Sequence, residues 1–223
     1  MTISVIIPVF NEEAILPAFL HQTAHWMVTE IIFVDGGSTD QTQAIIQRSS
    51  GHRLLISNKG RGNQMNEGAR AATGDILLFL HADSLFPDDG FSAILKAMQN
   101  PDLVGGAFRL TINSHSLFLK LIAMMANMRS FLFGLPYGDQ GFFVRRAVFN
   151  NMGGYPNLPL MEDVAFIKQL KREGRTTLLD QAITTSARRW IKQGIVYTSA
   201  RNIILLLLYF MGVSPKQLAK WYD

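Results

Sequence analysis

The chain of 223 residues contains no cysteine. This absence excludes disulfide bonds, thiolate catalysis and cysteine-ligated zinc sites, so the fold must be held together by packing. The motif G-x-x-x-x-G-K-[ST] is also missing, which excludes a P-loop. The first eight residues include no basic residue, and no small-residue cleavage site follows them. We therefore expect a first strand there instead of a signal peptide, and a cytoplasmic protein.

Charged residues are scarce, at 17% of the chain against 48% hydrophobic residues. A chain of this length and composition can bury one substantial core, so we expect one α/β domain with appendages. The charges are unevenly distributed. Residues 168–223 carry ten Lys or Arg and three Asp or Glu, a net charge of +7. Because the whole chain carries +4, residues 1–167 carry −3.

The basic C-terminal segment, residues 168–223, suits a partner that bears phosphate, either anionic lipid or a nucleoside diphosphate. A solvated basic helix face is the structural alternative. Nucleic acid is disfavoured as a partner, because long apolar runs interrupt the basic residues and no nucleic-acid-binding motif is present.

Strand and helix patterns alternate regularly over the first hundred residues. Helices are predicted over residues 13–26, 39–48 and 62–72, with Ser38 or Thr39 capping the second. Strands are predicted over residues 3–8, 30–34, 53–56 and 76–80. Repeated βα units of this spacing predict an α/β fold with a doubly wound, mostly parallel sheet flanked by helices.

The pattern changes after Pro101. A strand is predicted over residues 103–110, followed by a Met- and Phe-rich helix over 116–133. Apolar residues nearly encircle this helix, which is more than one buried face needs, so contact with an acceptor or a membrane is an alternative to core packing. A second apolar run, 203–213, has eleven residues, whereas a membrane span needs about 20. We expect this run to dock at a membrane interface or to pack on the main domain.

Residues 74–86 are predicted to be a buried strand that delivers one carboxylate to a pocket. Five consecutive apolar residues follow a Gly-Asp turn, as in a strand covered on both faces. The run stops at His81-Ala82-Asp83, and ligands of open α/β sheets collect outside the carboxyl ends of strands. Asp83 would there hold a divalent cation against a diphosphate. A helix N-cap or a turn aspartate is the alternative.

Acidic and amide side chains also follow the first two predicted strands. Glu12 is suited to a ribose diol, and Asp35 to a base N–H or a ribose hydroxyl, so together they predict a nucleoside pocket. For Asp40, a little farther on, helix capping is the favoured interpretation. The glycine-rich residues 59–68 enter a helix and supply Lys59 and Arg61 for a diphosphate, although they match neither common phosphate-binding motif.

Two later patterns carry further candidate chemistry. Glu162 and Asp163 open a helical pattern, where adjacent carboxylates usually favour the helix dipole but where a general base would also be placed. Like-charge repulsion from Glu162 would increase the proton affinity of Asp163. Arg188, Arg189 and Trp190 offer two guanidiniums beside an aromatic ring, suited to a pyrophosphate or a sugar.

These segments, in this order and spacing, resemble the family 2 glycosyltransferases with the GT-A fold. The resemblance is carried by residues 4–13 and 34–40, by His81-Ala82-Asp83 and by Glu162-Asp163, and it extends from residue 3 to about residue 190. It implies a metal-dependent, inverting hexosyltransferase that takes sugar from a nucleoside-diphosphate sugar with Mn²⁺ or Mg²⁺. By position, Asp35 would contact the nucleobase, Asp83 would bind the metal and Asp163 would be the catalytic base.

Two departures distinguish this chain within the family. The family's metal motif is Asp-x-Asp, and His81 stands at its first position, as in a small bacterial branch that this chain resembles. Imidazole is a poorer ligand than carboxylate for Mg²⁺ and an acceptable one for Mn²⁺. Processive members carry Gln-x-x-Arg-Trp, whereas Ser186 stands at the Gln position here. We therefore expect the addition of a single sugar.

The patterns and the resemblance together define a candidate site, a domain organisation and a set of partners. The predicted domains are a catalytic domain over residues 1–190 and a dependent helical segment over 191–223. The predicted partners are a nucleotide-sugar donor, a hydroxyl acceptor for which a lipid-linked molecule is one option, and a membrane surface at the inner face of the cell membrane, but no nucleic acid. The candidate residues are Asp163 and Glu162 for catalysis, Asp83 and His81 for the metal, and Pro8, Phe10, Glu12, Asp35, Lys59, Arg61, Asn66, His81, Ala82, Arg188, Arg189 and Trp190 for the donor.

Two rival functions keep the fold and change the chemistry. In one, His81 marks a decayed metal site, and the protein is a nucleotide-sugar-binding or membrane-docked scaffold. In the other, the protein is a nucleotidyltransferase that makes sugar nucleotides. Such enzymes usually carry a glycine-rich basic loop after the first strand, whereas this chain has the acidic Phe10-Asn11-Glu12-Glu13 there.

Overall fold

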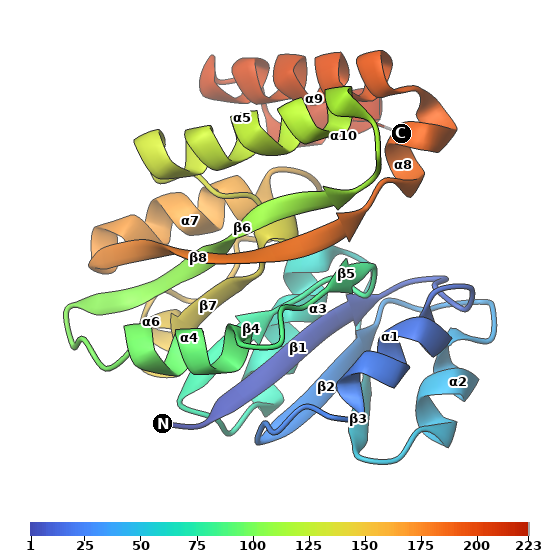
Figure 1. Cartoon of the computed structure of the whole chain (residues 1–223), viewed down its shortest axis with the longest axis vertical. Helices are drawn as coiled ribbons and strands as arrows, with labels where there is room; N and C mark the ends of the chain where they lie inside the picture. The colour runs from blue at the N-terminus through green and yellow to red at the C-terminus, as the bar shows by residue number, and fades with distance from the viewer. Residues whose placement is uncertain (223) are drawn as a thin grey trace.

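The computed structural model describes residues 1–222; Asp223, the last residue of the predicted helical segment, lies outside the described residues. One mixed sheet of eight strands in the order β3-β2-β1-β4-β7-β6-β8-β5 forms the centre of the molecule (Figure 1). Its strands are β1 (Ile3–Val9), β2 (Glu30–Asp35), β3 (His52–Ile56), β4 (Ile76–Phe79), β5 (Ser84–Leu85), β6 (Leu103–Asn113), β7 (Phe142–Arg145) and β8 (Arg175–Ser186).

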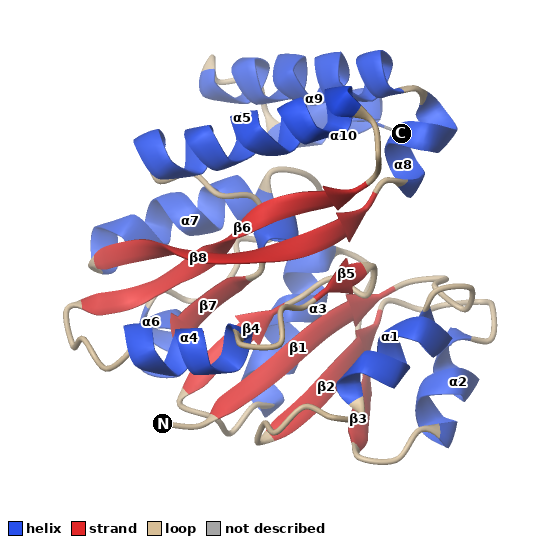
Figure 2. Cartoon of the chain, in the orientation of Figure 1, coloured by secondary structure: helices blue, strands red, loops and turns tan. Residues whose placement is uncertain are grey.

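Helices cover both faces of the sheet (Figure 2). They are α1 (Leu16–Thr23), α2 (Thr42–Arg48), α3 (Arg61–Ala71), α4 (Gly90–Ala97), α5 (Leu117–Phe133), α6 (Arg146–Asn151), α7 (Glu162–Glu173), α8 (Arg188–Gln193), α9 (Ile195–Phe210) and α10 (Pro215–Tyr222), with a short 3₁₀ helix, η1 (Gly138–Gln140). The predicted α/β class with a mostly parallel, helix-flanked sheet is confirmed.

The first half of the sheet is parallel, as the repeated βα units predict. Strand β1 pairs in parallel with β2 and with β4, and β2 pairs in parallel with β3. All four carboxyl ends therefore meet at one edge. The residues of β4 are completely or almost completely buried, which confirms the predicted strand covered on both faces.

Alternation along the strands divides the interior into two cores. On β1, Val5 and Ile7 pack with α1 and α4 residues, whereas Ile6 between them packs with α3 and α7 residues on the other face. Helix α3 approaches the sheet closely at Gly68, where a Cβ atom would lie 2.4 Å from Ile6 Cγ2. A glycine is therefore required for this approach.

The second half of the sheet departs from simple βα repetition. Strand β7 is antiparallel to both β4 and β6, and β6 runs parallel to the long β8. The sequence patterns did not predict β8 or α4. The predicted cap of α2 was wrong as well: neither Ser38 nor Thr39 caps it, and the Asp40 carboxylate accepts a hydrogen bond from the Thr42 amide at 3.0 Å.

The apolar run 203–213 lies mostly within the longer helix α9, which contacts α5. A small cluster of buried residues, including Ile112, Leu119 and Ala187, joins α5 and the start of α8 to the end of β6. Across residues 1–222, no helix is both long and apolar enough to cross a bilayer.

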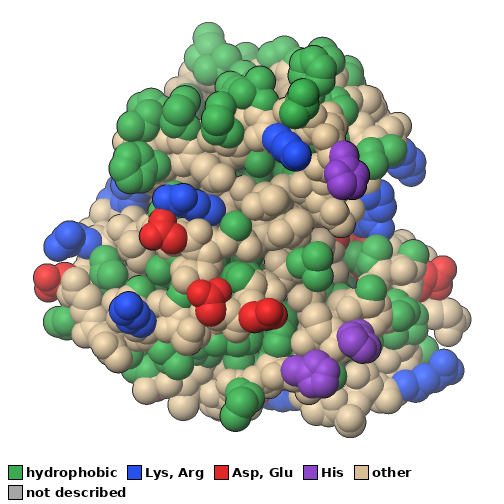
Figure 3. All heavy atoms as spheres, in the orientation of Figure 1, with side chains coloured by type: hydrophobic (Ala, Val, Ile, Leu, Met, Phe, Trp, Pro, Cys, Tyr) green, Lys and Arg blue, Asp and Glu red, His purple; other side chains and the backbone are tan. Residues whose placement is uncertain are grey.

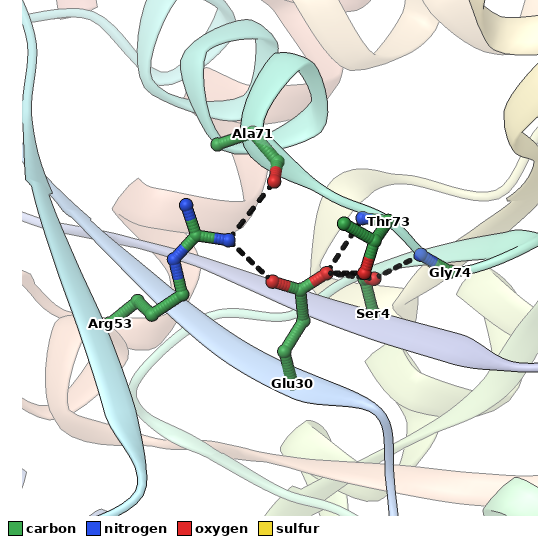
Figure 4. Close-up of polar contacts among 6 residues, drawn as sticks. All are labelled: Ser4, Glu30, Arg53, Ala71, Thr73 and Gly74. Atoms are coloured by element: carbon green, nitrogen blue, oxygen red, sulfur yellow. Dashed lines mark hydrogen bonds and ion pairs between the residues drawn. The ribbon is translucent and has the colours of Figure 1, made fainter.

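A polar cluster around Glu30 holds the amino-terminal ends of the strands together (Figure 4). The Glu30 carboxylate accepts hydrogen bonds from Ser4 Oγ at 2.8 Å, from the Thr73 amide and hydroxyl at 2.7 Å each, and from Arg53 Nη1 at 2.6 Å. Ser4 Oγ in turn accepts from the Gly74 amide. Burial opposes the charge, but the bonds from Thr73, Ser4 and Arg53 prevail and hold the pKa of Glu30 at about 2, below the usual 4.5.

Replacing Glu30 with glutamine should lower the free energy of unfolding at pH 7 by about 1–3 kcal/mol, because charge-assisted bonds are lost. Since the folded-state pKa lies below the unfolded one, the stabilisation by Glu30 is complete above the usual pKa of 4.5 and is lost as the pH falls toward about 2. Urea unfolding of wild type and variant should therefore show a difference that shrinks with acidification. Glu67→Gln, at an exposed pair with Arg70, is the control and should change little. A Glu30 effect that is independent of pH would contradict the assignment.

Candidate active site

A cleft of about 540 Å³ opens where the carboxyl ends of β1, β4 and β8 meet the starts of α3 and α7. The C-terminal helices α8, α9 and α10 contribute its remaining wall. Residues from eight separate segments line it: Asn11, Glu12, Arg61, His81, Asp83, Tyr137, Asp139, Leu160, Met161, Glu162, Asp163, Val164, Thr185, Ser186, Arg188, Arg189, Trp190, Lys192, Gln193, Asn202, Leu205 and Tyr222.

The end of β4 delivers His81 and Asp83 to the cleft, as the strand pattern predicted. Burial, together with the positive charge of Arg61, lowers the pKa of His81 to about 4. The imidazole is therefore neutral at pH 7 and keeps a lone pair available for a proton donor or a metal ion. Burial raises the pKa of Glu12, and the negative charge of Asp83 adds to this rise.

The start of α7 places Glu162 and Asp163 in the same cleft. Asp163 Oδ2 accepts a hydrogen bond from the Gly138 amide at 2.9 Å, and Oδ1 accepts one from the Val164 amide at 2.7 Å. Glu162 is buried and lies 3.8 Å from Arg61 Nη1. Burial and the neighbouring charge of Asp163 raise the pKa of Glu162, and Arg61 partly offsets this rise.

Met161, immediately before this pair, has an unusual backbone conformation. Its φ is +64°, and the other non-glycine residue with positive φ among residues 1–222, Asn11 at +53°, also lines the cleft. Asparagine tolerates the left-handed region, whereas methionine is rarely found there. The local conformational cost is thus concentrated where the two candidate catalytic carboxylates begin.

His81 and Asp163 both lie on the side of Gly138 where a Cβ atom would point. A Cβ atom at Gly138 would lie 3.4 Å from His81 Nε2 and 3.5 Å from Asp163 Oδ2. The imidazole and the carboxylate therefore lie close together beside η1, although their residues are 82 positions apart in the numbering.

Asp139 in η1 is a cleft residue that the sequence analysis did not select. Its Oδ1 atom is buried without a hydrogen-bond partner. Burial raises the pKa of Asp139 to about 6; Arg129 opposes this rise, whereas Asp163 and Asp83 add to it. The motif Gly138-Asp139-Gln140-Gly141 was the available signal, since it places an acidic residue between glycines before an apolar strand.

Positive charge reaches the cleft from Arg61, Arg188 and Arg189. Arg188 Nη2 lies 3.2 Å from Glu12 Oε2, so an ion pair bridges the end of β1 and the start of α8. Arg189 donates a hydrogen bond to the Tyr222 hydroxyl. Lys192 and Tyr222 are further lining residues that no sequence motif indicated.

Nine of the predicted site residues line the cleft; Asp35, described below, and five others do not. The nine are Glu12, Arg61, His81, Asp83, Glu162, Asp163, Arg188, Arg189 and Trp190; the five are Pro8, Phe10, Lys59, Asn66 and Ala82. Three of these five make other contacts: the Lys59 ammonium lies 4.2 Å from the Phe10 ring centre, and Asn66 exchanges two hydrogen bonds of 2.8 Å with the Tyr155 backbone.

Asp35, the predicted nucleobase contact, does not line the cleft either. It is fully buried at the end of β2. Its carboxylate accepts hydrogen bonds from the Gly37 and Ser38 amides, the Ser38 hydroxyl and the Gln43 side chain. The side chain therefore shapes the turn after β2. The predicted convergence of Asp35, Asp83 and Asp163 in one cleft holds for the last two only.

The oxygen and nitrogen atoms in the cleft suit a divalent cation that takes its remaining ligands from a bound molecule. Across residues 1–222, no three His, Asp or Glu side chains are grouped closely enough to surround an ion by themselves. The neutral His81, Asp83 and the unpartnered Oδ1 of Asp139 nevertheless offer ligand atoms in one cleft. Mg²⁺ sites commonly combine one or two carboxylates with substrate phosphates and water.

Comparison with known proteins connects this geometry to a family. Residues 4–153 match the family described as Glycosyl transferase family 2. A PGL/p-HBAD biosynthesis glycosyltransferase of Mycobacterium bovis is 34% identical over 172 residues, covering 68% of this chain and 62% of the relative. An undecaprenyl-phosphate 4-deoxy-4-formamido-L-arabinose transferase of Photorhabdus laumondii is 32% identical over 157 residues, covering 64% and 48%. The chain thus spans about half to three fifths of the length of these relatives.

Solved structures share the fold. The mannosyltransferase PcManGT from Pyrobaculum calidifontis, in complex with GDP-Man and Mn²⁺, superposes with a TM-score of 0.63 at 18% identity, over 82% of this chain and 56% of that one. S. aureus TarS 1-349 in complex with UDP-GlcNAc gives a TM-score of 0.66 at 20% identity, over 83% and 58%.

Comparison of Met161→Gly with Met161→Ala should isolate the backbone cost, because both remove the side chain and only glycine accepts φ of +64° freely. We expect the glycine variant to be more stable than the alanine variant by about 1 kcal/mol in urea unfolding. The same pair at Met128, an exposed position within α5, is the control, and there alanine should be more stable by about 1 kcal/mol. If alanine is also the better residue at position 161, the strain assignment is wrong.

Proposed function

Because this chain belongs to glycosyl transferase family 2, we propose that it moves a sugar from a nucleoside-diphosphate sugar to an acceptor hydroxyl, with inversion at the anomeric carbon and one sugar per reaction. The observation that carries this proposal is the cleft, where the Glu162-Asp163 pair and three arginines converge at the carboxyl ends of the strands. A displacement of a diphosphate by a hydroxyl needs both a proton acceptor and positive charge near the leaving group.

Asp163 is the proposed general base. Its Oδ2 atom is held by the Gly138 amide and its Oδ1 atom by the Val164 amide, so the carboxylate has a fixed orientation in the cleft. It would accept the proton of the acceptor hydroxyl while that oxygen attacks the anomeric carbon from the face opposite the diphosphate. Glu162, with its raised pKa and its contact to Arg61, is proposed to position this end of α7.

The leaving diphosphate is proposed to lie against Arg61, Arg188 and Arg189. Arg188 is paired with Glu12 and Arg61 with Glu162, so both guanidiniums are already oriented toward the cleft. Guanidinium groups match phosphate oxygens in geometry as well as charge. Trp190, beside them, is proposed to contact the sugar.

We propose that Asp83, with His81 and Asp139 beside it, holds Mn²⁺ or Mg²⁺. When bound, such an ion would offset the charge that develops on the diphosphate. Two features of the cleft support the assignment: the pKa of His81, about 4, leaves the imidazole neutral, and Asp139 Oδ1 is buried without a partner. His81 would then occupy the place of the first carboxylate of the family's Asp-x-Asp motif, a substitution that favours Mn²⁺ over Mg²⁺.

The nucleoside is proposed to bind next to the cleft, above the ends of β1 and β2. Asp35 would act there through the turn that its carboxylate holds, which presents the exposed Gly37 to a planar base. We propose that the remaining predicted donor-binding residues contact the donor near this nucleoside: Pro8, Phe10, Lys59, Asn66 and Ala82.

The acceptor is proposed to be carried by a lipid. One relative is named as an undecaprenyl-phosphate transferase. We further propose that residues 1–190 are the catalytic unit and that residues 191–223 are a dependent helical segment, since α8 and α9 complete a wall of the cleft instead of forming a core of their own.

Asp163→Asn should reduce donor consumption by about 10²–10⁴-fold, because the amide cannot accept the proton. Mass spectrometry of donor breakdown over a panel of nucleotide sugars, with Mn²⁺ and then Mg²⁺, first identifies the donor; calorimetry then compares nucleoside-diphosphate binding. Binding by the variant should remain close to that of wild type. Asp180→Asn, on an exposed carboxylate paired with Arg109, is the matched control and should be fully active. Wild-type turnover in Asp163→Asn would refute the base assignment.

Asp83→Ala should weaken nucleoside-diphosphate binding in Mn²⁺ at least about tenfold and remove most of its dependence on Mn²⁺, because a ligand shared with the phosphates is lost. Calorimetric titration with and without Mn²⁺ measures both effects. Asp102→Ala, at an exposed turn before β6, serves as the control. Binding that never depends on Mn²⁺ in the wild type, with no donor consumed, would instead favour the scaffold function.

A further inference from the structure

Helices α5 and α9 expose an extensive apolar surface. Nine of the 17 residues of α5 are large hydrophobic side chains exposed by 47–79%, and six of the 16 residues of α9 are hydrophobic side chains exposed by 48–77%. The two helices contact each other and lie side by side at the top of Figure 1. Figure 3 shows hydrophobic side chains gathered over these helices. We call this surface, formed by the exposed apolar residues of Leu117–Phe133 and Ile195–Phe210, the α5–α9 face.

Contiguous apolar surface of this kind needs an occupant. Soluble monomers scatter single exposed hydrophobic residues and rarely collect them on two adjacent helices. Helix α5 does have an inward face, at Leu119, Ala123 and Ser130, so its exposed residues are additional to those that the core uses. Packing within the described chain therefore leaves the α5–α9 face uncovered.

The charges around the face indicate which occupant fits. Residues 114–138 and 181–222 contain no Asp and no Glu, whereas Lys120, Lys192, Lys216 and Lys220 are exposed on or beside the helices. A surface that is apolar and cationic complements the anionic headgroups of a bilayer. A second copy of the chain is a poorer match, because a two-fold contact through this face would bring like charges together.

The face lies one helix away from the cleft. On α9, Asn202 and Leu205 line the cleft, while Ile204 and Leu207 point outward into the α5–α9 face. One helix therefore separates the cleft from the surface on which the face would rest.

We propose that the α5–α9 face lies in the interface of an anionic lipid bilayer, with its apolar side chains at the acyl-chain boundary and its lysines among the phosphates. This docking does not depend on the proposed transfer reaction. It would place the cleft at the membrane surface, within reach of a hydroxyl carried by a lipid.

Flotation with phosphatidylcholine vesicles containing about one-third phosphatidylglycerol tests the proposal. Wild-type protein should float with these vesicles at about 0.05 M salt. The double variant Phe118→Ser, Phe131→Ser and the double variant Ile204→Ser, Leu207→Ser should each bind at least about tenfold more weakly, because apolar insertion is lost. Met27→Ser with Ile56→Ser, which removes two exposed apolar residues elsewhere on the surface, should bind as wild type.

Lysine variants test the electrostatic contribution to vesicle binding separately from the apolar contribution. Lys120→Gln with Lys216→Gln should weaken binding to the anionic vesicles by about fivefold per lysine at low salt and much less at about 0.5 M salt. Arg48→Gln with Lys96→Gln, on α2 and at the end of α4, is the matched control and should have no effect.

Two further measurements accompany the flotation assay. All variants should retain the wild-type thermal unfolding midpoint, since the substituted side chains are exposed. Hydrogen exchange on wild-type protein should show vesicle-induced protection confined to residues 117–133 and 195–211. Absence of flotation, unchanged flotation of the serine variants, or a wild-type dimer in light scattering that the serine variants abolish would each overturn the proposal. Docking without sugar transfer would contradict the proposed function alone, and transfer without docking would contradict this inference alone.

Discussion

Two buried glutamines hold the backbone on which the cleft depends. Gln64 Nε2 donates to the carbonyl oxygens of Val9 and Val34 at 2.8 Å each, which ties α3 to the ends of β1 and β2. Gln140 Nε2 donates to the Phe108 carbonyl, while its Oε1 accepts from Ser130 and from the Tyr137 amide. Each amide satisfies strand or loop groups that water cannot reach, so loss of either would leave buried polar groups unpaired. These bonds help to position Arg61, three residues before Gln64 in α3, and Asp139, which precedes Gln140 in η1.

The sequence predicted the first half of the fold well because repeated parallel βα units produce a regular pattern of apolar runs in the sequence. Continuous apolar runs such as Ile76–Phe79 mark strands that are covered on both faces, and their ends mark the edge where polar side chains gather. His81 and Asp83 could be selected on this ground, and Glu162 with Asp163 could be selected as an acidic helix start. The first half of the sheet and these four positions require only local patterns together with one rule of topology.

What the sequence did not predict depends on contacts between distant segments. Asp35 is a residue type that often binds ligands, but its carboxylate accepts hydrogen bonds from Gly37, Ser38 and Gln43 instead. Asn66 likewise pairs with the backbone of Tyr155, 89 residues away. Asp139 lies in the cleft beside Gln140, whose side chain donates a hydrogen bond to the Phe108 carbonyl of β6. Strand β8 consists mostly of half-buried residues and includes several threonines, a weaker signal than the apolar runs of the parallel half.

Helix α5 cannot turn about its own axis. Asn127 exchanges two hydrogen bonds with Leu110 of β6, Ser130 is bonded to Gln140, and Arg129 Nε donates to the Leu135 carbonyl at 2.9 Å while its guanidinium lies 3.3 Å from the Tyr137 ring centre. The same bonds that fix η1 in the cleft wall thus fix which side of α5 faces outward. A planar surface that contacts this side of α5 would therefore bind the molecule in one orientation. The direction in which the cleft opens relative to that surface is then determined by the fold.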